Sequence, residues 1–439
     1  MIDPNWIWGI FEIVLLTALV MSGVHVFISV GVVSIVFAVL YYGDLSGINL
    51  VGTTILNRTF TYEMSMVPLF ILMGAWVEVA GLGKDAYDAC MKWLSRLKGS
   101  LAYITTASNA LFSAVSGMAL AGVATIGSIA LPEMKRYGYS AKLRTGVVSG
   151  GTLLSSLIPP SAVAVIYSLF TDESLGQLFM SGVIPGIIMV VLFIAIIYIW
   201  VTLRPSAAPM LPREVHFTWG ERFRAIGGVG PIAVIFLFMM GGIYLGWFSP
   251  TEAAGMGAFG VLAVTLVLRR MSWHNFNEAL NSTLRLSAYT FFILGGAFVF
   301  SHTLAITKLG TGIGNLIAGT GLNRVVIMYI IAIIVIIAGT ALDMFPMTVL
   351  FIPVFYPLVI SLGFSGIWFG CLWMLLMDLA MVTPPLAGPL YLTQLIDGCS
   401  TKDVMLGVIP FYTACFIVVV LMIQFPAIVL WLPTKMVGG

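Results

Sequence analysis

The sequence predicts an all-α polytopic membrane protein, built as two inverted repeats that each contain a re-entrant helical hairpin and a broken helix. Three observations support this fold class. The 439 residues are 60% hydrophobic and only 9% charged, with a mean hydropathy of +1.07. Several stretches exceed the roughly 18 apolar residues that mark a spanning helix. Helix-breaking residues interrupt four of the apolar segments, and this pattern occurs twice along the chain.

The internal repeat rests on three pairs of landmarks related by nearly the same shift in register, 222 residues. Two pairs follow the shift without deviation, and the third departs from it by three residues. Three landmarks in register make a strong internal repeat, whereas one short match would be weak. The pairs are the segments 70–77 (FILMGAWV) and 292–299 (FILGGAFV), the residues Gly117 and Gly339, and the Pro-Pro pairs at 159–160 and 384–385.

We therefore expect residues 1–203 to form the first repeat and residues 228–439 to form the second. The segment 204–227 is polar and contains three prolines, so it is expected to be a cytoplasmic linker. A connector through Arg285 is expected within the second repeat. The apolar stretches expected to span the membrane lie near residues 7–21, 26–42, 66–80, 182–201, 230–247, 252–267, 290–304 and 404–431.

Two long segments are expected to be re-entrant hairpins. Residues 101–134 are too long for one comfortable span, and their centre is small and weakly polar. The tip of this hairpin is expected at Ser116 and Gly117. In the second repeat, residues 325–363 are expected to form the corresponding hairpin, with its tip at residues 339–343.

Two further segments are expected to be broken helices. Residues 143–170 are interrupted at Ile158-Pro159-Pro160, and residues 368–395 at Thr383-Pro384-Pro385. Proline removes a backbone donor and biases the preceding residue away from the helical conformation. Non-helical backbone at membrane depth is tolerated only where protein or a cavity satisfies the freed groups. Such breaks are therefore candidates for ion and substrate sites.

Residues 84–98 are expected to form an amphipathic helix. Tyr87, Cys90, Trp93 and Leu97 recur at helical spacing, opposite charged side chains. Trp93 and the flanking lysines favour a helix that lies in the plane of the membrane surface over a solvated connector. Residues 306–322 stand at the equivalent place in the second repeat.

Basic residues near the ends of the spans set the expected orientation. With the N-terminus outside, sixteen Lys and Arg fall on the inner side, and only Arg58, Lys308, Arg324 and Lys435 fall on the outer side. The first hairpin then enters from the cytoplasm and the second from outside. The two halves are therefore inverted repeats, which is the architecture of secondary transporters.

Several other classes of protein find no support in the sequence. The net charge of +2 gives no reason to expect nucleic acid as a partner. Cys90, Cys371, Cys399 and Cys415 form no CxxC pair, so they predict neither a disulfide framework nor a zinc site. No nucleophile with its base and no Walker motif is present, so we expect no catalytic residues and no ATP-driven pumping. The first residues lack a basic region, which predicts a retained first helix rather than a cleaved signal.

The four breaks are expected near the membrane midplane. Unwound carbonyls and small hydroxyls can coordinate a hard monovalent cation there, and helix N-termini can face an anion. No Lys or Arg lies in these segments, so an anionic substrate has to be neutralised by bound cations and helix dipoles. This favours sodium coupling. The residues expected near the substrate are Gly117, Thr340 and Asp343.

Two alternatives stay open for these tips. One is that Ser, Gly and Thr only let helices pack closely, which does not explain why Pro-Pro follows both broken segments. The other concerns Asp343 and Asp378, the acidic residues closest to the second tip. An intramembrane carboxylate is a candidate for proton relay, although Asp343 is better interpreted as a helix cap.

The segment 246–254 (GWFSPTEAA) resembles the G-x-F-T-P-T-E-A-A signature of the large membrane subunit of TRAP (tripartite ATP-independent periplasmic) transporters, the DctM-like proteins. Five further segments are similar to the same family, and together the motifs cover nearly the whole chain. These segments are PLFILMGAWVEVAGL from Pro68, GSIALPEMKRYGYS from Gly127, LIPPS from Leu157, ALDMFP from Ala341 and TPPLAG from Thr383.

The resemblance implies a multi-pass protein of the bacterial or archaeal cytoplasmic membrane, in contact with membrane lipid. It implies sodium-driven uptake of an organic acid by an elevator movement of the hairpin-bearing domain. It also implies two protein partners, which are a periplasmic binding protein that delivers the acid and a small four-helix membrane subunit. Glu252, within the signature, is expected to have a structural role at the start of a span.

The family pattern also implies two sodium sites. Ser155 and Ala380 stand where the family more often has Gly, but backbone carbonyl ligands survive such changes. One site would use Ser113, Ser116, Ser155, Ile158 and Pro159, and the other would use Gly339, Ala380, Thr383 and Leu386.

Two hypotheses from other classes remain. A stand-alone elevator carrier of organic anions would work without a binding protein, so transport that depends on an added periplasmic protein would argue against it. An intramembrane enzyme would use Asp343 and Asp378, and the absence of a second catalytic motif weighs against this hypothesis.

Overall fold

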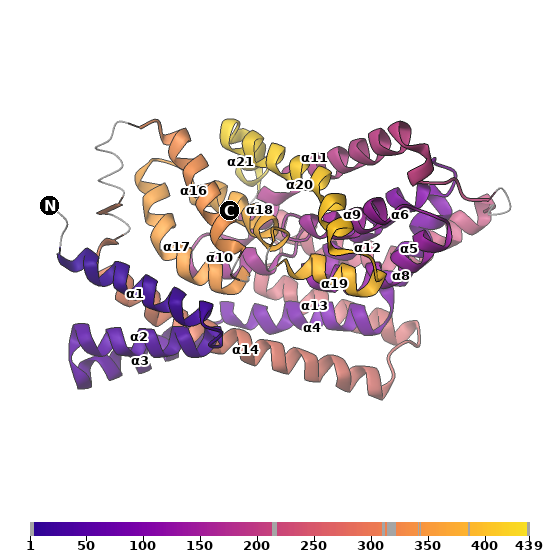
Figure 1. Ribbon diagram of the computed structural model, residues 1–439. Helices are drawn as coiled ribbons and strands as arrows, with labels where there is room; N and C mark the ends of the chain where they lie inside the picture. Colours follow the sequence, from indigo (N-terminus) through magenta and orange to yellow (C-terminus); the bar gives the residue numbers. More distant parts are fainter. Residues whose placement is uncertain are drawn as a thin grey trace.

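The computed structural model describes residues 4–212, 217–309, 312–313, 322–340, 342, 344–384 and 387–436 (Figure 1). These residues form helices and connecting turns, without a β-strand. The predicted all-α class is therefore confirmed.

The helices of the first half are α1 (Pro4–Met21), α2 (Val26–Tyr42), α3 (Asp44–Thr59), α4 (Met66–Val79), α5 (Leu82–Leu94), α6 (Ser100–Ser116), α7 (Ala119–Gly122), α8 (Ser128–Arg136), α9 (Ala141–Gly151), α10 (Ala162–Thr171) and α11 (Leu175–Leu203), with a π-helical turn η2 (Val123–Gly127) and a 3-10 turn η3 (Thr152–Leu154). Those of the second half are α12 (Trp219–Tyr244), α13 (Pro250–Val267), α14 (Trp273–Ile306), α16 (Arg324–Gly339), α17 (Met344–Ser361), α18 (Gly366–Met381), α19 (Gly388–Asp397), α20 (Thr401–Gln424) and α21 (Ala427–Leu430).

The helices pack as two bundles. In the frame bundle, which comprises α1–α4 and α12–α14, α14 packs against α2, α3 and α4, and α13 packs against α4 and α12. In the hairpin bundle, which comprises α6–α11 and α16–α20, α9 packs against α6 and α20, and α18 packs against α16, α17 and α20. Figure 1 shows α4 and α14 side by side along the lower edge of the view, with the hairpin bundle above them.

Only some of these helices can cross a membrane by themselves. In the described part of the chain, six are long and apolar enough to do so, and a seventh span results if α3 and α4 count as one bent pair. The helices at the four predicted breaks are shorter, between 10 and 17 residues in α6, α9, α10, α16, α18 and α19. A hydrocarbon core about 30 Å thick needs about 20 helical residues. Two of these shorter helices must therefore combine to cross it.

The four predicted breaks are confirmed, and they fall at equivalent places in the two halves. The elements α6 to α11 correspond in order to α16 to α20, with α7, η2 and α8 matching α17. The starts of α9 and α18 are 225 residues apart (366 against 141), and those of α10 and α19 are 226 apart (388 against 162). The observed spacing therefore agrees with the repeat read from the sequence.

The structure departs from the expected elements in several places. The expected linker 204–227 is shorter, because α12 already starts at Trp219. The connector through Arg285 is helical, because α14 runs without interruption from Trp273 to Ile306. No Gly or Pro occurs from Trp273 to Leu294, and the Ser272 side chain accepts a hydrogen bond from the Asn275 amide at the start of the helix. Sequence analysis missed α3, whose polar residues lower its hydropathy. The pair formed by α3 and the segment Glu63–Val79 is bent by 68°.

The amphipathic helix is present as α5, but it ends at Leu94, four residues earlier than expected. Its apolar face packs against α6 and α12. Tyr87 and Cys90 are buried there, whereas Trp93 is 40% exposed and Leu97, beyond the helix end, is 46% exposed. Protein neighbours therefore cover the first part of the apolar stripe that suggested a membrane-surface helix, and its later part stays exposed.

Glu252 has the structural role expected of it. Its carboxylate accepts a hydrogen bond from the Ser249 amide at 2.8 Å, and the Ser249 hydroxyl accepts one from the Glu252 amide at 3.3 Å. This reciprocal capping box starts α13 with Pro250 in its first turn.

Candidate functional site at the helix breaks

The first hairpin turns at Gly117. α6 ends at Ser116, and Gly117 adopts the left-handed conformation with φ +62°. A side chain at this position would be strained, and its Cβ would collide with the carbonyl oxygen of Pro160. The hairpin tip and the first broken helix therefore touch through their backbones. Ser113 and Ser116 are both buried, and the Ser116 hydroxyl has no hydrogen-bond partner.

The first broken helix is unwound between η3 and α10. Ser155, Pro159 and Pro160 are buried there, and Ile158 is half-buried. The Ser155 hydroxyl donates to the Thr152 carbonyl at 2.7 Å. η3 packs against both α6 and α7, so this segment lies against the first hairpin.

Asp378, which lies on α18 in the second repeat, forms hydrogen bonds with this unwound segment of the first repeat. Its carboxylate accepts hydrogen bonds from the Ser156 amide at 3.1 Å and from the Ser156 hydroxyl at 2.7 Å. The Ser155 hydroxyl is 3.5 Å from the same carboxylate. Asp378 is 3% exposed, and no ion pair of this residue is present among the described side chains. A buried carboxylate thus fixes the first break.

The second hairpin meets the second broken helix in a similar way. Gly339 ends α16, and a Cβ at this position would collide with the side chain of Ala380. The Thr383 hydroxyl donates to the Leu379 carbonyl at 2.7 Å and lies 3.3 Å from the Tyr412 hydroxyl. The Thr340 hydroxyl donates to the Ile337 carbonyl. Asp343 and Leu386, also expected at this site, lie outside the described residues.

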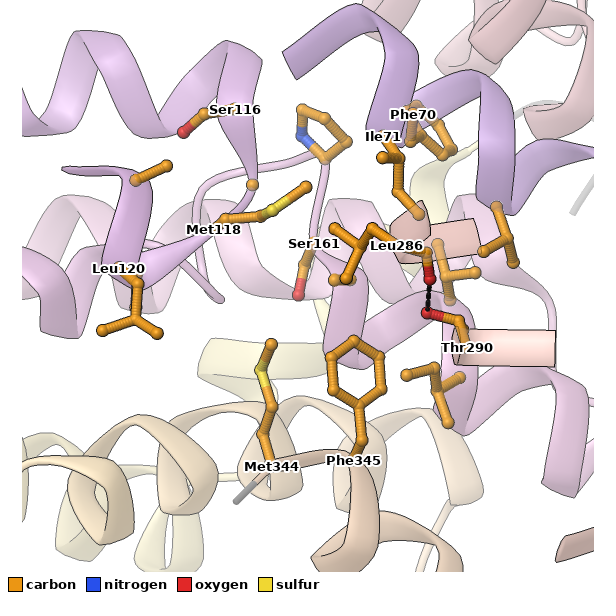
Figure 2. Close-up of a pocket in the computed structure, with 18 of the residues that line it drawn as sticks. Phe70, Ile71, Ser116, Met118, Leu120, Ser161, Leu286, Thr290, Met344 and Phe345 are labelled. Carbon is orange, nitrogen blue, oxygen red and sulfur yellow. Dashed lines mark hydrogen bonds between the residues drawn. The ribbon is translucent and has the colours of Figure 1, made fainter. Parts of the chain in front are cut away.

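The breaks converge on one cavity of about 260 Å³. Its lining includes Ser116 and Gly117 at the first tip, Pro160 and Ser161 at the first break, and residues that flank the second tip and the second break. The opposite wall belongs to the frame bundle, through α4 and α14. Figure 2 shows Met118 from the hairpin bundle extending toward the same space as Phe70, Leu286 and Thr290 from the frame bundle. The cavity therefore lies between the two bundles.

The cavity wall is mostly apolar and carries no charged side chain among its described residues. Ser161, in the wall, caps α10 by accepting a hydrogen bond from the Ala164 amide. The N-terminus of this ten-residue helix therefore points its positive dipole end toward the cavity. The cavity can accordingly hold an anion near a helix N-terminus, next to an unpartnered hydroxyl.

Arg285 is a charged group near this cavity that sequence analysis did not assign to the site. It lies on α14, one helical turn before Tyr289, and lines an open groove that meets the cavity at Leu286 and Tyr289. Its side chain is exposed, and the described part of the chain offers it no ion pair. The sequence placed Arg285 in a connector, and the continuity of α14 brings it to the groove.

A buried ion pair joins the two repeats. The Arg144 guanidinium donates two hydrogen bonds to the Asp397 carboxylate, with Nε–Oδ1 2.6 Å and Nη2–Oδ2 2.8 Å. Its third nitrogen donates to the Tyr139 carbonyl at 2.7 Å. Arg144 is in the first turn of α9, and Asp397 ends α19. The pair therefore ties the first broken helix to the second.

Comparisons with known proteins agree with this geometry. Residues 13–428 match the model of the DctM component of the tripartite ATP-independent periplasmic transporters. The chain belongs to this family. It is a large permease subunit of the TRAP type and a multi-pass protein of the cytoplasmic membrane.

Curated TRAP permease relatives cover most of the chain. The C4-dicarboxylate large permease DctM of Pseudomonas aeruginosa is 29% identical, covering 85% of this chain and 86% of its own. The 2,3-diketo-L-gulonate large permease YiaN of Escherichia coli is 25% identical, covering 91% and 93%. The sialic acid large permease SiaM of Vibrio cholerae is 26% identical, covering 96% and 97%.

Two solved structures share the fold. The YdaH transporter of Alcanivorax borkumensis superposes with a TM-score of 0.61 at 14% identity, covering 88% of this chain and 90% of its own. MtrF of Neisseria gonorrhoeae superposes with a TM-score of 0.61 at 13% identity, covering 87% and 85%. At such identities the likeness concerns the fold alone.

Proposed function

We propose that this TRAP permease imports an organic acid with sodium ions, after a periplasmic binding protein delivers the acid. The observation that carries the proposal is the cavity at the converging helix breaks. Its described wall contains a buried unpartnered Ser116 hydroxyl and an α10 N-terminus, but no basic side chain. Positive charge for an acid would then come from bound cations and the helix dipole.

The residues around the breaks fit a small hard cation. Serine and threonine hydroxyls and carbonyls freed from helical bonding are the oxygen ligands that such a cation requires. We propose that the first site uses Ser113 and Ser116 with Ser155, Ile158 and Pro159. The second would use Gly339, Ala380, Thr383 and Leu386. The contacts of Gly117 with Pro160 and of Gly339 with Ala380 support this pairing of each tip with the break of its own repeat.

The substrate is proposed to occupy the cavity itself, near Gly117, Thr340 and Asp343. The cavity lies between the hairpin bundle and the frame bundle, which supports an elevator movement of the hairpin bundle. Such a movement would carry the site across the membrane along α4 and α14. The small four-helix membrane subunit would support the frame bundle. In this proposal the chain carries a solute and performs no catalysis.

Reconstitution tests this function directly. We expect sodium-driven uptake in proteoliposomes only when the small membrane subunit and the loaded binding protein are both present. Little uptake is expected from the chain alone, because the cavity offers no basic side chain to select an acid from dilute solution. Radiolabelled uptake of a C4-dicarboxylate, a keto acid and a sialic acid, each with its binding protein, would measure this. Robust uptake of free substrate by the chain alone would instead identify a stand-alone carrier.

Replacing Arg285 with glutamine is expected to raise the dissociation constant of the acid in the inward-facing cavity about tenfold. In the expected orientation Arg285 lies on the cytoplasmic side, so its guanidinium would act on the anion where the cavity opens toward the cytoplasm. Binding of the radiolabelled acid to the purified chain in saturating sodium would measure this constant. Arg285→Lys should keep most of the affinity, and Arg96→Gln, which removes an exposed charge beyond the end of α5, serves as the control. An unchanged dissociation constant in Arg285→Gln would contradict the assignment.

A further inference from the structure

Arg222 is a buried arginine without a counter-ion. It lies in the first turn of α12 and is 7% exposed. Its Nε and Nη2 atoms are buried and have no hydrogen-bond partner. Arginine is charged at every physiological pH, and buried charges are normally paired. Among the described residues, this guanidinium therefore has no counter-ion and lacks two hydrogen-bond partners.

The described acidic residues of α12 and α5 do not pair with Arg222. The Glu221 carboxylate accepts hydrogen bonds from the amide and the hydroxyl of Thr218, in the capping box that starts α12. On α5, Asp85 forms an ion pair with Arg270. Asp88 is exposed, and the basic residues whose charges act on it are Lys84 and Lys92 of its own helix. None of these carboxylates is the counter-ion of Arg222.

The surroundings of Arg222 resemble a membrane–water boundary. Its guanidinium lies 4.9 Å from the centre of the Trp219 ring. Trp93 of α5 donates from Nε1 to the Arg222 carbonyl at 3.1 Å, and its ring packs edge-on against Trp219 and Phe223. These three aromatic side chains remain 40% to 66% exposed. Exposed tryptophans next to basic residues are typical of the headgroup level of a bilayer.

A further buried polar atom lies in the same region of the chain. The Ser95 hydroxyl, two residues beyond Trp93, is buried and has no partner. Arg96 and Lys98 follow it, and Arg224 follows Arg222, so basic residues are dense at this end of both helices. In the orientation expected from the charge distribution, this end lies on the cytoplasmic side, where anionic lipids attract basic segments.

We propose that Arg222 binds the phosphate of an anionic phospholipid of the cytoplasmic leaflet, between α5 and α12. A phosphate diester offers the two oxygens that match a guanidinium edge. The exposed rings of Trp93, Trp219 and Phe223 would lie beside the glycerol and the upper acyl chains. A lipid is favoured over a soluble anion because these rings form an apolar rim around the charge. The site is separate from the cavity at the helix breaks.

Lipid titration of the purified full-length chain tests this site. Native mass spectrometry in detergent would count bound phosphatidylglycerol, and thermal unfolding in nanodiscs with and without phosphatidylglycerol would measure its stabilising effect. In Arg222→Met the apparent affinity for phosphatidylglycerol is expected to fall about tenfold, and in Arg222→Lys by less. Arg222→Met removes a buried unpaired charge without shortening the side chain, so it is expected to fold. Arg224→Gln, an exposed charge on the same helix, is the matched control.

Each outcome decides the assignment. Selective loss of lipid binding in Arg222→Met, with Arg224→Gln unchanged, supports it. Equal losses in both variants would show attraction to the basic surface in general and would overturn it. An equal thermal shift from inorganic phosphate in phosphatidylcholine nanodiscs would identify a soluble-anion site instead. Loss of the phosphatidylglycerol effect when the small membrane subunit is present would identify that subunit as the group covering Arg222.

Discussion

Replacing Arg144 with methionine is expected to destabilise the permease by about 3–5 kcal/mol, because it leaves the Asp397 carboxylate buried without its counter-ion. The Asp397 side chain is inaccessible to solvent, and two of the three hydrogen bonds of the Arg144 guanidinium end on it. The expected observation is a large drop in the thermal unfolding midpoint of the purified protein in detergent, with loss of transport at lower temperatures than in the unaltered chain.

A double-mutant cycle separates the free energy of the ion pair from the effects of the two single substitutions. Arg144→Met combined with Asp397→Leu replaces both charges with apolar groups, which is often close to neutral for buried pairs. The double variant should therefore recover most of the stability that either single variant loses. Arg136→Met removes an exposed arginine at the end of α8 and is expected to change stability by less than about 0.5 kcal/mol. A double variant as unstable as the sum of the singles would contradict the interpretation.

The four helix breaks could be predicted from sequence because their signals are local. The sequence pairs Pro159-Pro160 and Pro384-Pro385 predict helix breaks whatever the tertiary contacts around them, because proline acts on the local backbone. Gly117, in the middle of a small-residue segment, is suited to the left-handed turn that ends α6. The repeat then supported each assignment, since a break in one half predicted a break in the other. These features needed no knowledge of tertiary contacts.

Other elements could not be predicted because hydropathy was the only guide. Residues 273–289 are polar on one face, so they resembled a connector, although the absence of Gly and Pro was a usable signal for a continuous α14. α3 was missed for the same reason. The apolar stripe of α5 was visible in the sequence, but whether lipid or protein covers it depends on where α6 and α12 pack.

The contacts that fix the candidate site are long-range and lay beyond sequence reasoning. Asp378 and Ser156 are 222 residues apart, and Arg144 and Asp397 are 253 apart. Asp378 was visible as an intramembrane carboxylate, and proton relay was one interpretation of it. In the structure, Asp378 accepts hydrogen bonds from the unwound segment of the first repeat. We therefore expect its substitution to alter the conformation of that segment first.

Replacing Asp378 with alanine is expected to raise the sodium concentration needed for half-maximal uptake by about 10- to 100-fold, the effect of one lost hydrogen bond to a charged group, which contributes about 1.5–3 kcal/mol. The variant loses the acceptor of the Ser156 amide and the Ser156 hydroxyl. The unwound carbonyls from residue 155 onward would then lose the arrangement that sodium is proposed to need. Uptake by the complete reconstituted transporter, measured across a range of sodium concentrations, gives the midpoint directly.

A binding measurement distinguishes this role from a general loss of structure. Sodium-induced thermal stabilisation of the purified chain does not require transport, and it should shift to higher sodium concentration in parallel with uptake. Ser156→Ala removes the hydroxyl donor but keeps the hydrogen bond from the backbone amide of residue 156 to Asp378. Its shift should therefore be smaller than that of Asp378→Ala. Asp378→Asn keeps the side-chain volume and one acceptor oxygen, so its sodium midpoint should lie between those of the other two variants.

A reduced maximal rate with an unchanged sodium midpoint would show that Asp378 supports folding or movement instead of the ion site. Full uptake driven by a proton gradient without sodium would contradict sodium coupling itself, whatever the effect of the substitution.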